Sequence, residues 1–166
     1  MKRDLTMQAL LDHDVISVAE LDSAIHATRG TRSNWLEQLV LLGRLDEEAF
    51  CMCMSRALLV PRCDPRRLAR IPRQVLQGLP LETILEHQVL PVWQDHEGDL
   101  HVAMVQPVDS VRWEEIQFFA SGQRRLMREI IGPTAMAWAF HHYFGVESTL
   151  WPAQQHRPQA LVMAAQ

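Results

Sequence analysis

Side chains able to do chemistry occur in this chain mostly as adjacent pairs, a spacing that few active sites use. Glutamate pairs at 47–48 and 114–115 stand where helices are expected to begin, and the positive end of a helix dipole explains acidic residues there. His141 and His142 are adjacent rather than four apart, with no carboxylate or cysteine at ligand spacing beside them. We therefore expect no metal and no catalytic residues, while a hidden active site among these groups stays an open alternative.

Two common catalytic motifs are missing from the sequence. Lysine occurs only at Lys2, so the chain has no Gly-x-x-x-x-Gly-Lys loop for the phosphates of ATP. It also lacks the Gly-x-Ser-x-Gly turn that carries the nucleophile of many serine hydrolases. We predict that the chain is not an enzyme and needs no cofactor.

The strongest local charge is the stretch "RCDPRRLARIPR", residues 62–73, which carries five arginines against one aspartate. It is either a solvated connector or a contact for an acidic partner or a phosphodiester. Tryptophan often anchors interfaces, and Trp35 lies where a surface helix is expected to begin, although burial in the core would explain it equally well. The candidate partner-binding residues are Trp35, Arg66, Arg67, Arg70 and Arg73.

Bulk composition bounds the class of protein. The 166 residues carry a net charge of -4, with 48% apolar and 22% charged residues, which fits one globular domain or two small ones. The negative charge argues against nucleic acid as a partner. No segment approaches the length of about 20 apolar residues that a membrane helix needs, and the N-terminus is too charged for a signal peptide. We expect a cytoplasmic protein with reduced cysteines, with peripheral attachment to the inner membrane left open.

Near the N-terminus an apolar pattern occurs twice at a constant offset, as the pairs Leu10/Leu39 and Leu21/Phe50 show. Each copy is predicted to be a pair of helices, and residues 29–33 form a spacer between the copies. Ser17 and Glu20 have the spacing of a capping box, Gly43 suits a helix end, and Asp46 suits a helix start. Two such units can bury their apolar faces against each other, so we expect internal pseudosymmetry.

The later sequence alternates strands and helices. "QVLPVWQ" and "DLHVAMV" are predicted strands joined by the turn "DHEG". "SVRWEEIQFFASG" is a predicted helix capped by Ser110 and stopped by Gly122, and "RRLMREIIG" is a third strand. Pro133 begins the last helix, which Gly145 ends.

These elements predict an α+β fold, with a pair of repeated helical hairpins packed on a small α/β part containing roughly three strands. We expect a hairpin subdomain at 1–58, a connector rich in proline and arginine at 59–75, and an α/β subdomain at 76–146. The tail, 147–166, gives weak signals and is expected to be disordered or a linker.

Taken together, this pattern resembles the MshEN or GspE N-terminal domain of type II secretion and type IV pilus assembly ATPases. Two units of equal length, 5–28 and 34–57, match that family in length and spacing. The later part matches through "HQVLPVW", "GDLHVAMVQPVD" and "HHYFG", so the resemblance covers about residues 5–145.

Some members of this family bind cyclic di-GMP through an Arg-Leu-Gly sequence that opens each repeat. In this chain the openings are Leu-Thr-Met at 5–7 and Asn-Trp-Leu at 34–36. Losing each arginine removes a charge-assisted bond of about 1.5–3 kcal/mol. Arg3 and Arg32, however, are separated by the same offset as the repeats and could replace the lost cations. If the nucleotide binds, the candidate ligand-binding residues are Arg3, Arg32, Leu10, Leu39, Gly43 and Asp109, the last closing "GDLHVAMVQPVD".

The resemblance implies a non-catalytic docking or regulatory module of a bacterial secretion, pilus or exopolysaccharide machine. Its partner would be the cytoplasmic domain of a membrane protein of that machine, or an attached or associated ATPase or glycosyltransferase. The alternative function is a cyclic di-GMP receptor with degenerate motifs, for which the nucleotide would be a regulatory ligand.

Overall fold

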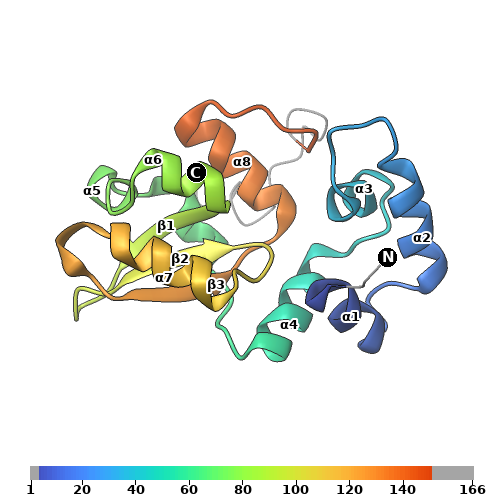
Figure 1. Cartoon of the computed structure of the whole chain (residues 1–166), viewed down its shortest axis with the longest axis horizontal. Coiled ribbons are helices and arrows are strands. Elements are labelled where there is room, and N and C mark those ends of the chain that lie inside the picture. Colours follow the sequence, from blue (N-terminus) through green and yellow to red (C-terminus); the bar gives the residue numbers. More distant parts are fainter. Residues whose placement is uncertain (1–3, 151–166) are drawn as a thin grey trace.

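Four helices form the N-terminal part of the molecule and lie beside a three-stranded sheet with its own helices (Figure 1). The computed structural model describes residues 4–150. The N-terminal helices are α1 (Leu5–Asp12), α2 (Val18–Ala27), α3 (Trp35–Leu41) and α4 (Glu47–Leu58).

Each N-terminal helix begins at a polar residue whose side chain accepts a hydrogen bond from a backbone N–H of the first turn. These N-caps are Asp4, Ser17, Asn34 and Asp46. The capping box predicted for Ser17 and Glu20 is present, and Asn34 forms another with Glu37. Local sequence therefore fixes where all four helices start.

The two repeats share the same turn between their helices. Asp14 and Gly43, which occupy equivalent positions in the two repeats, both adopt the left-handed conformation, with φ of 54° and 66°. The N–H of Asp14 donates to the carbonyl of Leu11 at 3.1 Å, and the N–H of Gly43 donates to that of Val40 at 3.0 Å. One residue later, the N–H of Val15 donates to the carbonyl of Leu10, and the N–H of Arg44 donates to that of Leu39, both at 2.9 Å. The expected internal pseudosymmetry is confirmed at the level of single hydrogen bonds.

Helices pair across the repeats: α1 packs on α4, and α2 packs on α3. The equivalent residues Leu10 and Leu39 both have 0% of their surface exposed. Cys53 is also buried, and its thiol donates to the carbonyl of Ala9 at 3.4 Å, which joins α4 to α1. Each repeat thus completes the core of the other.

The α/β part contains β1 (Val89–Gln94), β2 (Leu100–Met104) and β3 (Leu126–Ile130), in that order in the sheet. β1 and β2 form the predicted antiparallel hairpin, whereas β3 runs parallel to β2. The crossover between them contains α7 (Ser110–Phe119) and the short 3-10 helix η2 (Ser121–Gln123). The predicted α+β class with three strands is confirmed.

Sequence reasoning missed several short helices. They are η1 (Pro65–Arg70), α5 (Arg73–Leu76) and α6 (Leu81–His87). The predicted ends of α7 were also wrong: Asp109, not Ser110, caps it by accepting from the N–H of Arg112 at 2.9 Å. Extended backbone at Ala120 stops α7 before Gly122, which instead takes a φ of 69° within η2. The final helix, α8 (Pro133–Phe144), ends at Gly145 as predicted.

One hydrophobic core runs through both parts of the chain. α3 packs on α8 and α4 packs on β3, and Glu47 of α4 accepts a hydrogen bond from the N–H of Thr134 at 2.7 Å. The domain boundaries proposed above stay predictions. Of the predicted tail, Leu150 is buried, and residues 151–166 lie outside the described residues.

Among residues 4–150, no helix combines the length and the apolar character needed to cross a bilayer.

Candidate functional site

The predicted nucleotide-binding residues do not form one exposed surface. Leu10 and Leu39 have 0% of their surface exposed, so their contact with a ligand, which stays a prediction, would require the core to open. Arg32 is exposed in the spacer before α3, and Gly43 is exposed just beyond the end of that helix. Asp109 is exposed at the start of α7. Arg3 lies outside the described residues.

A cavity of about 290 Å³ lies where the second repeat meets the α/β part; we call it the boundary cavity. Asn34 and Leu36, which occupy the altered opening of that repeat, line it together with Arg112 of α7. Glu37 and Glu86 also line it. The cavity therefore lies at the opening predicted for a nucleotide, but its arginine comes from α7 and two carboxylates share its lining.

The predicted partner-binding residues divide between the two parts of the chain. Trp35 is half-buried and packs against the core at the start of α3. The four arginines lie on η1 and α5, which pack on β1. Arg66 pairs with Asp64 at 2.9 Å and holds the pKa of that carboxyl below its usual range. Part of the predicted positive charge is therefore neutralised locally.

Arg67 has a different environment, because its guanidinium lies on an aromatic ring. It is 3.8 Å from the centroid of the Trp93 ring on β1, within the range of a cation–π interaction. On β2, the His101 ring stacks with Trp93 at 3.9 Å, and the two planes differ by 19°. Arg67, Trp93 and His101 form what we call the stacked cluster.

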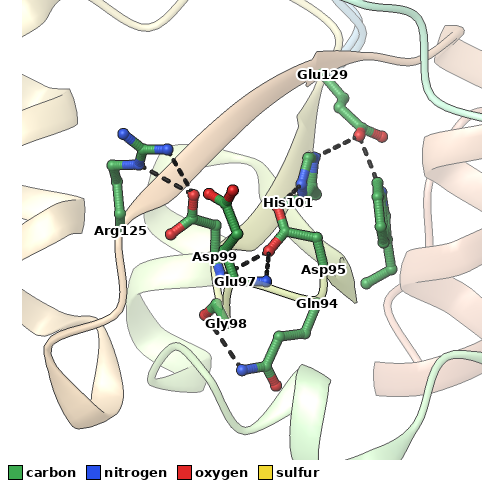
Figure 2. A network of polar contacts seen from close by, with 9 residues as sticks. Gln94, Asp95, Glu97, Gly98, Asp99, His101, Arg125 and Glu129 are labelled. Atoms are coloured by element: carbon green, nitrogen blue, oxygen red, sulfur yellow. Dashed lines mark hydrogen bonds and ion pairs between the residues drawn. The ribbon is translucent and has the colours of Figure 1, made fainter.

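Hydrogen bonds to two carboxylates hold this cluster in place. Glu129 of β3 is 5% exposed and accepts from the indole N–H of Trp93 at 2.9 Å. Its Oε2 also lies 2.8 Å from Nδ1 of His101, and Nε2 of His101 lies 2.9 Å from Oδ2 of Asp95. Figure 2 shows His101 between these carboxylates. The bond with His101 is the main cause that lowers the pKa of Asp95.

The hairpin turn beside His101 is braced by its own carboxylates. Asp95 accepts from the N–H groups of Glu97 and Asp99, at 2.9 and 3.0 Å. Asp99 accepts from Arg125 at 2.7 Å (Figure 2). Side chains in such a network lose little further freedom when a ligand binds, so the stacked cluster is preorganised.

The stacked cluster suits binding better than catalysis. Both ring nitrogens of His101 already have carboxylate partners. The thiol of Cys63 lies close to Glu129, but burial raises its pKa, which disfavours the reactive thiolate.

Arg67 and Arg70 line a shallow groove together with Trp93 and Asp95. Among residues 4–150, no group of three or more His, Cys, Asp or Glu side chains has the arrangement of a metal site. The groove offers two arginines, one of which lies on an aromatic ring.

Sequence reasoning found the arginines of this site but not Trp93, His101 and Glu129. Each of these three residues is polar or amphipathic and lies within a mostly apolar strand. That break in the apolar pattern is the sequence signal that could have identified them. Register between strands brings them together, and that register cannot be read from any one strand.

Comparisons with known proteins agree on the fold. A family model described as the MshEN domain matches residues 59–150. The N-terminal domain of XpsE is similar in structure, with a TM-score of 0.59 and 21% identity over 87% of this chain and 100% of that chain. A structure of MshE with cdg gives a TM-score of 0.57 and 21% identity over 86% of this chain and 100% of that chain.

No curated protein matches the chain significantly. The family model nevertheless covers more than half of the 166 residues, and its match falls on the sheet and helices that carry the stacked cluster. The chain therefore belongs to the MshEN domain family.

Proposed function

We propose that this chain is a non-catalytic docking module of a bacterial secretion, pilus or exopolysaccharide machine. It would act in the cytoplasm and bind the cytoplasmic domain of a membrane protein of that machine, or an associated ATPase or glycosyltransferase. Family membership supports the kind of machine. The observation that carries docking is Arg67, held on Trp93 by a ring stack and a buried glutamate.

The partner surface would be acidic. Arg67 offers a guanidinium whose position is fixed in advance, and Arg70 extends the same groove. Arg66 contributes less, because Asp64 already accepts three hydrogen bonds from its side chain. A carboxylate of the partner can bind both nitrogens of a guanidinium at once, a geometry that lysine cannot provide.

The test is a titration of the whole chain with the cytoplasmic domain of a candidate membrane partner, chosen from neighbouring genes. Replacing Arg67→Glu and Arg70→Glu should weaken binding at least tenfold, because two attractions become repulsions. Arg29→Glu together with Arg44→Glu is the matched control, since both residues are exposed in the helical part. Equal loss in both double variants, or no loss in the first, would remove the groove as the docking site.

Trp35→Ala is a separate arm of this test. Trp35 packs against the core, so its loss should lower stability as well as any binding. Binding is therefore compared at a temperature at which circular dichroism shows both proteins folded. A folded Trp35→Ala protein that binds normally would limit the interface to the groove.

A second candidate function is a cyclic di-GMP receptor. The boundary cavity favours it, because Asn34 and Leu36 at the repeat opening line that cavity, and the related MshE has a structure with cdg. Against it, Glu37 and Glu86 also line the cavity, and carboxylates repel phosphates. Calorimetry with cyclic di-GMP decides: no heat at high micromolar ligand ends this candidate. If heat is seen, Arg32→Ala and Arg112→Ala test which cation binds the phosphates.

A further inference from the structure

A different face of the α/β part exposes large apolar side chains. α6 and α7 pack against each other and run antiparallel. The N–H of Ser121, just past α7, donates to the carbonyl of Gly78, just before α6, at 2.9 Å. His87 at the other end of α6 lies 3.9 Å from Glu115 of α7. The start of α6 and the end of α7 therefore share one end of this two-helix layer.

Aromatic side chains are exposed at this shared end. Phe118 is 83% exposed and Phe119 52%, and their rings meet edge to face at 5.3 Å. Leu81, at the start of α6, is 52% exposed. We call these three residues the aromatic face. Single exposed apolar residues are common, but adjacent exposed rings beside a leucine are typical of a binding surface.

Acidic residues border the aromatic face on both helices. Glu82 of α6 directly follows Leu81, and Glu114 of α7 lies one turn before Phe118; both are exposed. The arginines that follow α7 are Arg124, which is half-buried, and Arg125, which pairs with Asp99 at 2.7 Å and is thereby partly neutralised. An apolar centre with a rim of one charge fits a ligand that has an apolar centre and a rim of the opposite charge.

We propose that the aromatic face binds a basic amphipathic helix of a partner protein. Leucine-like side chains of that helix would cover Phe118, Phe119 and Leu81, and its lysines or arginines would meet the glutamates. A twofold contact with a second copy would place acidic rims against each other. An anionic membrane would be repelled for the same reason. The surface is separate from the groove of the stacked cluster, so either proposal can fail alone.

The first experiment uses the full chain and a fluorescent amphipathic helical peptide of leucine and lysine. A peptide with the same leucine pattern but glutamate in place of lysine is the comparison. The leucine–lysine peptide should bind at least tenfold more tightly, and added salt should reduce the difference. Equal binding of both peptides would overturn the proposal.

Variants then locate the binding surface. Phe118→Ser with Phe119→Ser should weaken peptide binding at least tenfold, while Leu5→Ser with Val18→Ser is the matched control on the first repeat. Leu5 and Val18 are 58% and 49% exposed, so all four changes should leave the melting temperature nearly unchanged. Glu82→Lys with Glu114→Lys should reverse the preference between the two peptides. Unchanged preference in that variant contradicts the acidic rim.

Three other occupants are outcomes of the same tests, and each would overturn the proposal. The first is a second copy, shown by sedimentation of a dimer that Phe118→Ser dissociates. The second is a segment of this chain outside the described residues, shown if Leu161→Ser with Val162→Ser raises peptide affinity tenfold. The third is a membrane, shown by Phe118-dependent binding to phosphatidylglycerol vesicles.

Discussion

The two N-terminal repeats are alike on the inside and unlike on the outside. Inside, Leu10 and Leu39 are equally buried, and Asp14 and Gly43 make equivalent turns with equivalent hydrogen bonds. Few of their polar side chains correspond. Folding of the repeat therefore depends on the apolar pattern, the caps and one left-handed residue, and it leaves the outer surface free to change.

Outside, within residues 4–150, the second repeat makes the main contacts with the α/β part, with α3 on α8 and α4 on β3. Glu47 of the second repeat accepts from Thr134 at the start of α8, where Gly132 provides no side-chain cap. The equivalent position in the first repeat is Val18, which is 49% exposed. Glu47 thus acts as the N-cap of a helix in the other half of the chain. These equivalent positions differ because Glu47 packs against the α/β part, and not because of the internal structure of the repeats.

Truncating the equivalent leucines gives the largest expected effect. Leu10→Ala and Leu39→Ala should each lower the free energy of unfolding by about 2–5 kcal/mol, because each leaves a cavity in the shared core. Urea unfolding measures both. If one variant loses more than twice as much stability as the other, the repeats do not support each other equally.

The left-handed turns come next in size. Gly43→Ala should cost about 1–2 kcal/mol, because an L-residue is strained at a φ of 66°. A Cβ at Gly43 would meet no atom within 4 Å, so this cost comes from backbone conformation alone.

Asp14→Gly is the matched change in the first repeat. It should alter the unfolding free energy by less than about 0.5 kcal/mol, since relief of strain and the greater freedom of the unfolded chain offset each other. If Gly43→Ala also leaves the unfolding free energy nearly unchanged, the repeats do not depend on the left-handed conformation at this turn.

Replacing Glu47 should lower stability less than the leucine and glycine changes, but it should distinguish the outer surfaces of the two repeats. Glu47→Ala removes the hydrogen bond to Thr134 and should cost about 1 kcal/mol, the usual value of an N-cap. Val18→Ala, at the equivalent position, should change stability by less than about 0.5 kcal/mol. Similar losses in the two variants would contradict the role of Glu47 as a cap for α8.

The pH dependence of stability gives the smallest effect. Burial is the main cause that raises the pKa of Glu47 above its ordinary value of 4.5. A raised folded-state pKa means that the stabilising contribution is full below the ordinary pKa and is lost as pH rises through the raised one.

Glu47→Gln keeps the hydrogen-bond acceptor but cannot ionise, so it is the control for this effect. The stability of the unmodified chain relative to Glu47→Gln should fall as pH rises from the ordinary pKa through the raised one. Urea unfolding at a series of pH values measures this difference. A constant difference would mean that the pKa of Glu47 is not raised.

Most of the fold could be predicted because its signals are local. Ser17 with Glu20, Asp46, Gly43 and Gly145 mark helix ends within a few residues of the elements that they stop or start. α6 was missed because Pro80 begins it without a side-chain hydrogen bond, and because its seven residues are too few for a clear period.

The site was predicted less well because its contacts are distant in sequence. The arginine cluster was visible as a run of charge, but the stack of Arg67, Trp93 and His101 depends on how η1 packs on the sheet. Glu129 could have been noticed as a charged residue in an apolar strand. Its two partners could not have been identified without strand register.

The thiol of Cys53 is a native reporter of the separation of the two N-terminal repeats. Alkylating reagents attack the thiolate, and burial raises the pKa of this sulfur, which also points at the main chain of the opposite repeat. Its rate of modification would therefore follow the transient parting of α1 from α4. A partner that stabilises the packing of α1 on α4 would slow alkylation of Cys53, and one that separates these helices would speed it.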